Sequence, residues 1–522
     1  MLKKISNYFY AIIHLKPIQV IYRLFYLLKK NKANKIKLLP KKSYQLVMTD
    51  SINSYSSYRD KNTFSFLNQS YQFHEKIDWN YIGFGMLWTY NLNYFEFLAQ
   101  DTFDRETGQV LINDYIEQYQ DIHIGYDSYP ISLRNIFWIR FLVKYKIHDE
   151  KIDAFLYDTY KILLQNLEYH LLGNHLLENA FSLLIGAYYF HDTMLYNKAY
   201  KLLKTELEEQ ILNDGGHFEL SPMYHQILLY RLLDCINIVS NNKWKEDDLL
   251  RFMHKIASIM LSWLKNMTFP SGAIPFLNDT SGNIAPSSGE LFDYAEQLCI
   301  RYDSIPLSDS NYRIFRNDRY AFICDIDGIS PAYQCGHAHA DTFNFVMEVD
   351  GRPLFVDTGC STYQTGRIRI FERGTLAHNT VTVNGDNSSH VWASHRVGKR
   401  ARVTVLEDSP HCIMAQHNGC GNKIHSRTFI QKNDYIEIID EIKGIKNDSK
   451  NVALFHLDNS IKNISIQGNK VIISDIKLVF DGASNLNIVD YEQAIGFNKK
   501  VSAKYICVDF DKKLKTKINF FN

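Results

Sequence analysis

Two histidines one residue apart, His337 and His339, begin the stretch whose residue types most directly suggest chemistry, GHAHADTFNFVMEVDGRPLFVDTG. Asp341 follows the histidines at once, and Asp357 lies near the end of the same stretch. A third histidine, His378, comes soon afterwards in GTLAHNT. Zinc prefers imidazole nitrogen and carboxylate oxygen, and three protein ligands plus a water form a common zinc site. These residues therefore predict a metal site, a catalytic site, or the polar rim of an ordinary hairpin.

The spacing of these residues sets a geometrical condition on a metal site. The middle of the stretch has the pattern of two strands joined by Asp350-Gly351, a pair that is typical of two-residue hairpin turns. A regular hairpin would pair Asp357 with Asn344 and would point its side chain to the sheet face opposite that of His339. A metal site that uses both side chains therefore requires GHAHAD to leave the strand through a bulge or a loop.

A second candidate set lies in the N-terminal half, in GNHLLENA and DGGHFELSPMYHQ. Asn174 and His175 begin an apolar pattern with helical spacing, where a polar residue can cap the helix or take part in chemistry. In SPMYHQ, Ser221 suits the N-cap position and Pro222 the first helical position. Tyr224 then falls in the first turn, where the helix dipole favours an anion, so we expect its phenol pKa to lie below the usual value near 10. Such a tyrosine could serve as a base or simply pack.

The elements that must position these residues change type near residue 305. Before it, HLLENAFSLLIGAYYF, DAFLYDTYKILLQNLEYHLL, NKAYKLLKTELEEQIL, ILLYRLLDCINIV and LLRFMHKIASIMLSWL repeat apolar residues with helical spacing, and short connections indicate helical hairpins in series. After it, NTVTVNG, RARVTVLED, DYIEIIDEI and NKVIISDIKLVFDG alternate apolar and polar residues, which predicts an antiparallel sandwich. We expect a partly helical arm over residues 1–75, a helical domain over 76–305 and the sandwich over 306–522.

Composition limits the classes of function. A chain of 522 residues exceeds what one hydrophobic core usually holds, so two or more domains are expected. The formal net charge of +1 argues against a general nucleic-acid-binding surface. The eight cysteines are scattered without a CxxC pair, which indicates neither a disulfide framework nor a zinc ribbon. The 34 Tyr and 32 Phe would suit a cleft that holds sugars, although a tyrosine-rich core is the simpler and preferred explanation.

The N-terminal segment, MLKKISNYFYAIIHLKPIQVIYRLFYLLKK, does not have the pattern of a secretion signal. Its apolar stretch is short, is interrupted by His14, Lys16 and Pro17, and lacks a small-residue cleavage site. No run in the chain approaches the roughly 20 apolar residues of a membrane span. We expect a basic, amphipathic arm that either contacts a membrane surface peripherally or packs on its own protein.

In order along the chain, the motifs resemble those of the heparinase II/III-like polysaccharide lyases, a family that includes alginate lyases. The resemblance runs from LWTYNLNYFEFL and YPISLRNIFWIRF through NHLLENA and SPMYH to PSGAIPFLNDTSG, GHAHAD, LFVDTG and RGTLAHNTVTV. The family fold implies a multidomain α + β protein with an N-terminal incomplete α/α toroid followed by a C-terminal antiparallel β-sandwich. This agrees with the two periodicities of the sequence.

The resemblance also implies an activity, β-elimination across the C4–O bond of a uronic acid residue. Removal of the C5 proton is hard because the adjacent carboxylate is negative, and neutralising that carboxylate stabilises the developing enolate. By the resemblance, Asn174 and His175 neutralise the carboxylate. Tyr224 acts at C5 or at the leaving oxygen as base and acid, and His337 is its partner across the cleft.

Further roles are carried over in the same way. The implied substrate-binding residues are Tyr363, Glu178 and Arg373, and the implied metal ligands are His339, Asp357 and His378. The metal would be one divalent ion, zinc ahead of calcium or manganese, with a structural role in holding the loop that presents His337. Asp341 would then support the site without binding the ion.

The expected partner is an acidic polysaccharide and not a nucleic acid. The basic concentrations near the motifs are RIRIFER and HRVGKRAR, so we expect a non-sulfated bacterial uronate polymer such as a capsule or exopolysaccharide. The sequence favours a cytoplasmic location, whereas the family resemblance implies a periplasmic one. The oligomeric state is not determined by the sequence.

Two alternatives remain open at the level of sequence. One is a glycan-binding or assembly protein of polysaccharide biosynthesis that keeps the fold without turnover. The other is a non-haem iron oxygenase, because His339, Asp341 and His378 also fit a facial triad of two histidines and a carboxylate. The oxygenase would leave the helical half and Tyr224 without a role.

Overall fold

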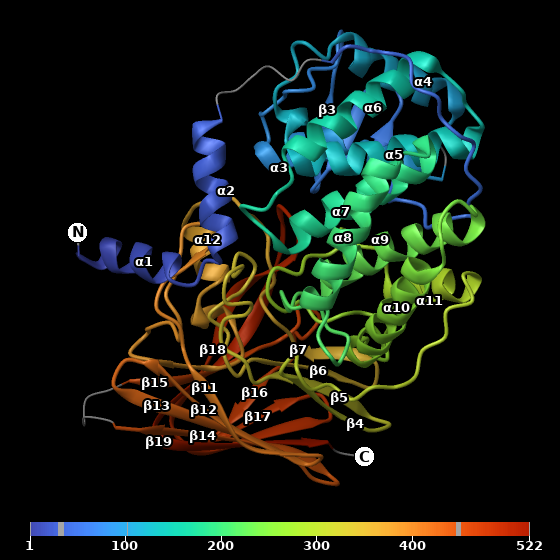
Figure 1. The fold of residues 1–522 in the computed structure, drawn as a ribbon. Helices are drawn as coiled ribbons and strands as arrows, with labels where there is room; N and C mark the ends of the chain where they lie inside the picture. The colour runs from blue at the N-terminus through green and yellow to red at the C-terminus, as the bar shows by residue number, and fades with distance from the viewer. Residues whose placement is uncertain (1, 30–35, 102, 445–449, 521–522) are drawn as a thin grey trace.

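A computed structural model of the protein describes residues 2–29, 36–101, 103–444 and 450–520. Figure 1 shows a helical domain packed on top of a strand-rich domain, with the first two helices at one side. The helical domain is an incomplete α/α toroid and the strand-rich domain is an antiparallel sandwich, as the sequence predicted. Within the described residues, no helix combines the length and the apolar character that crossing a bilayer requires.

The helices follow one another as short-looped pairs. They are α1 (Leu2–Ile12), α2 (Pro17–Leu28), α3 (Met86–Tyr94), α4 (Arg105–Glu117), α5 (Ser128–Tyr145), α6 (Glu150–Gln165), α7 (Gly173–Phe190), α8 (Thr193–Gln210), α9 (Pro222–Asn241), α10 (Asp248–Met267), α11 (Ser288–Gln297) and α12 (Arg367–Glu372). Short 3₁₀ helices are η1 (Glu96–Ala99), η2 (Ile124–Tyr126) and η3 (Thr375–Ala377).

Local sequence signals explain where several of these helices begin. Asp149 and Asp192 cap α6 and α8 by accepting hydrogen bonds from backbone N–H groups of the first turn. Ser287 and Glu290 form a capping box at the start of α11. The helix α7 is apolar on nearly all sides and is almost completely buried, so it lies at the centre of the helical domain.

One predicted helix ends earlier than its apolar pattern. The pattern in DAFLYDTYKILLQNLEYHLL continues to residue 172, but α6 ends at Gln165. The connection to α7 instead folds back so that Asn179 Oδ1 accepts the N–H of Glu168. This turn brings the Glu168 carboxylate beneath the start of α7, where it contacts His175.

The strands form separate sheets. They are β1 (Tyr58–Arg59), β2 (Thr63–Phe66), β3 (Gln69–Gln72), β4 (Tyr312–Arg316), β5 (Tyr320–Asp325), β6 (Phe345–Val349), β7 (Arg352–Phe355), β8 (Val381–Val383), β9 (Val391–Trp392), β10 (Arg396–Val397), β11 (Val403–Ser409), β12 (Cys412–Cys420), β13 (Lys423–Gln431), β14 (Tyr435–Lys443), β15 (Asn451–His456), β16 (Ser465–Gln467), β17 (Lys470–Ile473), β18 (Ile476–Gly496) and β19 (Lys499–Phe520). The segment expected to be a partly helical arm therefore also contains the small sheet β1-β2-β3.

Two antiparallel sheets make the sandwich. The smaller has the order β4-β5-β6-β7, and the larger runs β11-β12-β13-β14-β19-β18-β17-β16, with β15 joining β19 to β8. Phe322 and Phe345 of the small sheet pack with Phe429 and Ile506 of the large sheet in one core. The opposite face of the small sheet packs against the helical domain around Trp263. The small sheet is thus buried on both faces and fixes one domain to the other.

The hairpin of the opening motif departs from regular pairing, as a shared metal site would require. Asp350 and Gly351 both have positive φ values, 50° and 72°, which is the geometry of the predicted two-residue turn. The register shifts between Met347 and Glu348, and GHAHAD lies in an irregular segment before β6. The loop is therefore free to direct its two histidines independently of the sheet.

Candidate active site

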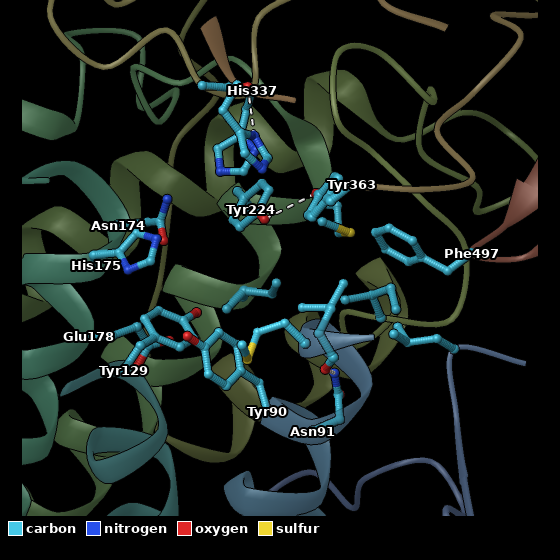
Figure 2. A pocket seen from close by; sticks show the side chains of 18 of the residues that line it. Tyr90, Asn91, Tyr129, Asn174, His175, Glu178, Tyr224, His337, Tyr363 and Phe497 are labelled. Carbon is cyan, nitrogen blue, oxygen red and sulfur yellow. Dashed lines mark hydrogen bonds between the residues drawn. The ribbon is translucent and has the colours of Figure 1, made fainter. Parts of the chain in front are cut away.

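A cleft with a volume of about 1120 Å³ lies between the two domains. Aromatic rings from distant parts of the chain line it, including Tyr90 and Tyr129 on the helical side and Tyr363 and Phe497 on the sandwich side (Figure 2). Six of the residues predicted from sequence also line it, namely Asn174, His175, Glu178, Tyr224, His337 and Tyr363. The fold therefore brings together most of the expected catalytic and substrate-binding side chains.

The two domains meet in this cleft at Tyr224 and His337. Their rings lie 4.1 Å apart, centre to centre, and the Tyr224 hydroxyl lies 3.1 Å from the hydroxyl of Tyr363. Figure 2 shows the three side chains converging from different segments. A phenol, an imidazole and a second phenol at such distances can move protons to and from a bound molecule.

The expected direction of the Tyr224 pKa shift is wrong. Ser221 and Pro222 do begin α9, and Tyr224 does lie in its first turn. However, burial raises the pKa of Tyr224 well above its usual value, and the hydrogen bond with Tyr363 opposes this only in part. The Ser221 hydroxyl pairs with Thr280 and does not cap the helix. Desolvation of the phenolate therefore exceeds the effect of the helix dipole, and the resting side chain is a neutral phenol.

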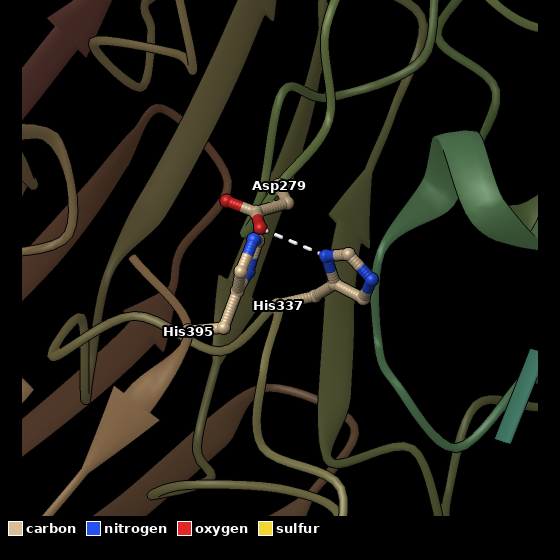
Figure 3. A group of neighbouring side chains, drawn as sticks. All are labelled: Asp279, His337 and His395. Carbon is tan, nitrogen blue, oxygen red and sulfur yellow. Dashed lines mark hydrogen bonds and ion pairs between the residues drawn. The ribbon is translucent and has the colours of Figure 1, made fainter. Parts of the chain in front are cut away.

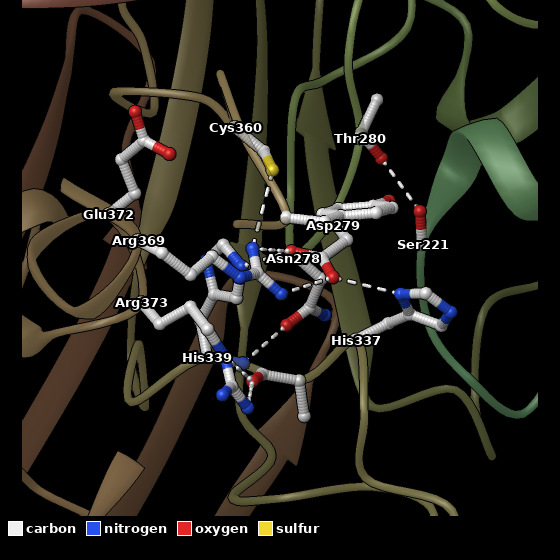
Figure 4. Close-up of polar contacts among 12 residues, drawn as sticks. Ser221, Asn278, Asp279, Thr280, His337, His339, Cys360, Arg369, Glu372 and Arg373 are labelled. Carbon is white, nitrogen blue, oxygen red and sulfur yellow. Dashed lines mark hydrogen bonds and ion pairs between the residues drawn. The ribbon is translucent and has the colours of Figure 1, made fainter. Parts of the chain in front are cut away.

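One buried carboxylate anchors the sandwich side of the cleft. Asp279 Oδ2 lies 2.8 Å from His337 Nδ1, Asp279 Oδ1 lies 2.8 Å from His339 Nε2, and the guanidinium of Arg369 bonds both oxygens (Figure 4). Burial opposes ionisation of Asp279, but Arg369 and the two histidines hold its pKa well below the usual range. Asp279 was not among the predicted site residues, although it lies in the motif PSGAIPFLNDTSG.

A second overlooked carboxylate, Glu219, meets the start of α7. It accepts hydrogen bonds from the backbone N–H and the side-chain amide of Asn174, all at 3.0 Å, and it lies 3.6 Å from His337 Nε2. Gly173 allows this approach because its φ is positive and an added Cβ would come within 2.6 Å of Glu219 Oε1. The helix N-terminus therefore faces the cleft as an anion-binding site that Glu219 holds at rest. In the sequence, Glu219 could have been found because it lies within the motif DGGHFELSPMYHQ.

His175 is held by a carboxylate of its own. Its Nδ1 lies 3.0 Å from Glu168 Oε1, and the second Glu168 oxygen accepts from the amide of Asn179. Burial lowers the pKa of His175, but Glu168 outweighs this and leaves that pKa raised. His175 thus tends to carry a positive charge at the cleft, which suits contact with an anionic group.

Glu178 lies one helical turn beyond His175 and faces the same cleft. It is fully buried, and neither carboxyl oxygen has a hydrogen-bond partner among the described residues. Arg231 Nε lies 3.5 Å from Glu178 Oε1. Burial raises the pKa of Glu178 to about 7 against the opposing effect of Arg231. Glu178 can therefore exist as a neutral acid that donates a hydrogen bond to a ligand.

Arg373 does not lie where a substrate-binding residue was expected. It is fully buried, and the structure does not place it in the lining of the cleft. Its guanidinium donates to the backbone carbonyls of Ala338 and Ser394. Because Ala338 separates His337 from His339, Arg373 supports the loop that carries both histidines and does not contact the cavity.

The predicted metal ligands do not converge as one group. His339 points Nε2 at Asp279, whereas His378 points Nδ1 at Asp357 Oδ2, 2.8 Å away. Asp357 also accepts hydrogen bonds from Asn344 and from the N–H of Gly359. Its oxygens are thus engaged in orienting His378. The sequence predicted Asp357 as a metal ligand and Asp341 as a supporting residue, and both assignments stay predictions.

Several buried donor atoms near this pair are left without a hydrogen-bond partner. His339 Nδ1, His378 Nε2 and both oxygens of Asp341 are buried and have no hydrogen-bond partner within the described part of the chain. The rings of His339 and His378 lie 5.3 Å apart. Burial raises the pKa of Asp341 to about 6 against the opposing effect of His378. Two imidazole nitrogens and a carboxylate form a donor set that zinc accepts.

A different trio already has its atoms within 4.8 Å of one another: Asp279, His337 and His395 (Figure 3). Both oxygens of Asp279 are bonded to Arg369, whose buried positive charge would repel a cation at that carboxylate. His395 is exposed, and its Nδ1–H donates a hydrogen bond to the Gly336 carbonyl. Asp279 therefore fits an ion pair with Arg369 and a hydrogen bond to His337 better than the coordination of a metal ion.

Comparison with known proteins gives one consistent family. The family model described as Heparinase II/III N-terminus matches residues 128–290, and the one described as Heparinase II/III-like, C-terminal matches residues 300–520. A heparin-sulfate lyase of Bacteroides stercoris is 25% identical over 315 residues, which cover 54% of this chain and 45% of the relative. A heparin-sulfate lyase of Bacteroides thetaiotaomicron is 23% identical over 303 residues, 48% of this chain and 40% of the relative. The matches thus span less than half the length of either relative.

The fold is shared over a longer range than the sequence. A crystal structure of heparinase III superposes with a TM-score of 0.69 at 16% identity, covering 97% of this chain and 89% of that chain. At this identity the likeness establishes a common architecture, a helical toroid followed by an antiparallel sandwich.

Proposed function

This chain belongs to the heparinase II/III-like family, and we propose that it is a polysaccharide lyase that cleaves a uronic-acid-containing polymer by β-elimination. The observation that carries the proposal is the meeting of Tyr224 and His337 in the cleft between the domains, with ring centres 4.1 Å apart. An elimination needs one group that takes a proton and one that gives a proton, and both stand there within reach of one sugar ring.

The carboxylate of the uronic acid would bind on the helical side. The raised pKa of His175 favours its charged form, the amide of Asn174 lies at the start of α7, and Glu178 can donate while it is protonated. Hydrogen bonds and positive charge at this carboxylate stabilise the enolate that forms when C5 loses its proton.

His337 is the group we propose as base. With its Nδ1 proton donated to Asp279, the free Nε2 has a lone pair that accepts the C5 proton. Asp279 sets the tautomer and stabilises the imidazolium that results, because its own pKa stays low. This differs from the expectation that Tyr224 is the base, since its raised pKa keeps the phenol proton in place.

Tyr224 is the group we propose as acid. As the C4–O bond breaks and a C4–C5 double bond forms, the leaving oxygen takes the phenolic proton of Tyr224. The neighbouring Tyr363 hydroxyl, 3.1 Å away, can donate a hydrogen bond to the phenolate that remains. The proton on His337 then returns to Tyr224 across the contact between the two rings, which restores the resting enzyme.

A divalent metal, zinc before calcium or manganese, would be held by His339, His378 and Asp341. Such an ion supplies structural cross-linking and charge, not a reacting group. Asp279 already contacts both His337 and His339 of the irregular loop. An ion at His339 would add a second anchor to the same loop.

We propose a non-sulfated acidic polymer, such as a capsule or exopolysaccharide, as the substrate. Four arginines line the cleft, Arg23, Arg231, Arg396 and Arg400. Three of them already contact protein groups: Arg23 the His170 carbonyl, Arg231 the Glu178 carboxylate, and Arg400 the Ala332 carbonyl. This supports recognition of one carboxylate per uronate more than of several sulfates per sugar.

The test uses the unsaturated uronate that β-elimination produces, which absorbs in the far ultraviolet. The protein is incubated with a panel of sulfated and non-sulfated uronate polymers while absorbance is followed. We expect growth of absorbance on a non-sulfated polymer, loss of it in Tyr224→Phe, and no change in Tyr71→Phe, a matched tyrosine outside the cleft lining. Binding of a polymer without any absorbance change in the unmutated protein would overturn the proposal in favour of a glycan-binding protein.

A further inference from the structure

The N-terminal helices expose an unusual concentration of large apolar side chains. Of the 26 large hydrophobic side chains that are exposed in the described part of the chain, eleven lie within residues 8–28. Leu27 and Leu28 are 82% and 81% exposed, and Phe9 and Ile21 are 60% and 61% exposed. Figure 1 shows α1 and α2 at one side of the molecule, with the N-terminal end of α1 far from the body. Contiguous exposed apolar surface of this kind marks an interaction site.

The polar face of α2 is turned towards the protein. Gln19, Arg23, Tyr26 and Lys29 recur at helical spacing, and each donates to a backbone carbonyl in the connection 165–171. The opposite face therefore has to point away from the protein, and it consists of Ile, Val, Leu and Phe side chains. An ordinary surface helix has the reverse orientation, with its apolar stripe against the core. This arrangement leaves the apolar face for a partner outside the chain.

The N-terminal segment that contains these helices carries charge of one sign only. The first 49 residues contain eleven Lys and Arg and no Asp or Glu, so residues 50–522 carry 47 basic against 57 acidic residues. Lys30, Lys32 and Lys35 of this set lie outside the described residues. The arm thus differs sharply in charge from the rest of the protein, and it is suited to an anionic partner.

The basic segment HRVGKRAR lies beside the same helices. Tyr8 of α1 packs on Trp392 with ring centres 4.9 Å apart, and Arg396 lies 5.8 Å from the Tyr8 ring. Burial, followed by the charges of Arg400 and Arg402, lowers the pKa of His14, which joins α1 to α2. A basic loop far away in the sequence is therefore added to the rim of the apolar face.

We propose that α1 and α2 bind the surface of an anionic phospholipid bilayer, with the apolar side chains in the acyl–headgroup boundary and the basic residues at the headgroups. Two short helices that expose aliphatic and aromatic side chains, next to a basic loop, have the composition of interfacial membrane helices. A protein partner would require about one hydrogen bond per 100–200 Å² of interface, and the exposed face of α2 offers aliphatic and phenylalanine side chains instead.

Docking in this way would also orient the cleft. Ala11 and Arg23 of the two helices and Leu15 between them belong to its lining, together with Arg396 and Arg400 of the basic loop. One end of the cleft would therefore lie next to the bilayer, where a polymer that is attached to or emerging from a membrane could enter. This inference does not depend on the lyase activity, because it rests on the outer face of the helices.

The experiment measures binding of the full chain to vesicles by flotation. One set of vesicles contains phosphatidylcholine alone, and the other an equimolar mixture of phosphatidylcholine and phosphatidylglycerol. We expect at least about ten-fold stronger partition onto the anionic vesicles, weakening when NaCl is raised from about 0.1 M to about 1 M, because this shortens the Debye length from about 10 Å to about 3 Å.

Two triple variants test whether vesicle binding depends on the apolar face of α2 or on exposed apolar side chains anywhere on the protein. Ile21→Ser/Leu24→Ser/Leu28→Ser removes side chains that are 61%, 56% and 81% exposed, and Ile82→Ser/Val110→Ser/Met194→Ser removes side chains that are 63%, 65% and 59% exposed elsewhere. We expect the first to lose at least about ten-fold in vesicle binding and the second to retain it. Both sets of side chains are in solvent, so the melting temperature should stay within a degree or two of the unmutated protein, in line with about ±0.5 kcal/mol for surface changes.

Three outcomes would overturn the proposal. The unmutated protein could stay with the soluble fraction at all lipid compositions. Both triple variants could lose vesicle binding equally, which would show that the binding comes from nonspecific hydrophobic contacts over the whole surface. Alternatively, sedimentation velocity could show a dimer that the first variant converts to a monomer without any lipid affinity, which would make this face a contact between two copies of the chain.

Discussion

The two walls of the cleft differ in their carboxylates, because the helical wall mixes acidic and basic side chains whereas the sandwich wall carries basic ones. On the helical wall, Glu96 and Glu178 line the cavity and further glutamates stand directly behind it. On the sandwich wall, the lining residues from 332 onward include His337, Arg396 and Arg400 and no Asp or Glu within the described part of the chain. The helical wall is therefore built to share protons with a carboxylate, and the sandwich wall to attract an anionic polymer and to take a proton from it.

The walls also differ in how their charges are anchored. On the helical side each functional group has a carboxylate of its own, such as Glu168 for His175 and Glu219 for Asn174. On the sandwich side, one carboxylate, Asp279, contacts His337, His339 and Arg369 together. Damage to one helical carboxylate should thus stay local, whereas damage to Asp279 should affect the whole wall.

The largest expected effect is that of Asp279→Asn. It would leave the guanidinium of Arg369, which is fully buried, without a negative partner. We expect the free energy of unfolding to fall by about 3–5 kcal/mol and turnover to disappear, measured by urea denaturation and by the absorbance assay. The matched change on the helical wall, Glu219→Gln, keeps an acceptor for Asn174 and should cost no more than about 1–2 kcal/mol. Equal losses in both variants would remove the distinction between the walls.

The next prediction separates two roles of His337, the acceptance of the C5 proton and the hydrogen bond to Asp279. In His337→Gln the amide can still donate to Asp279, but it cannot accept the C5 proton. We expect kcat to fall by about 10²–10⁴-fold while the urea midpoint stays near that of the unmutated protein. Retained kcat would show that the base is a different group, and Tyr224 would again be the candidate.

A smaller effect concerns pH on the helical wall. Because burial raises the pKa of Glu178 to about 7, this side chain donates to the substrate carboxylate below that pH and repels it above. We expect kcat/KM to fall about ten-fold per pH unit above pH 7 as the donor is lost. Glu178→Gln keeps a donor at every pH, so its profile should lack this limb. If kcat/KM of the variant falls in the same way above pH 7, the group that titrates is not Glu178.

The smallest effect concerns the rim of the sandwich wall. Arg396 lines the cleft and is exposed, so its charge is screened by salt. We expect Arg396→Gln to raise KM for an acidic polymer about two- to five-fold at low ionic strength, with kcat unchanged, and the difference to shrink at about 1 M NaCl. Steady-state kinetics at two salt concentrations check this, and a change in kcat would contradict it.

Local sequence determined the elements and several functional residues of the cleft. Apolar spacing is a property of each segment, because a buried helix or strand needs one apolar face wherever it packs, and so the helical and strand-rich parts could be predicted. The turn at Asp350-Gly351 followed in the same way from the conformations those two residues tolerate. Asn174, His175, Tyr224, His337 and Tyr363 stood out because they occur in motifs of a family.

Only the tertiary structure decided which charges meet. Asp279 and Glu219 lie 58 and 45 residues from the groups they hold, His337 and Asn174, and no local pattern encodes a contact between distant loops. The direction of the Tyr224 pKa shift likewise depends on how deeply two domains bury the phenol. The outward apolar face of α2 could not be predicted either, because an amphipathic sequence specifies two faces but not which one the rest of the protein covers.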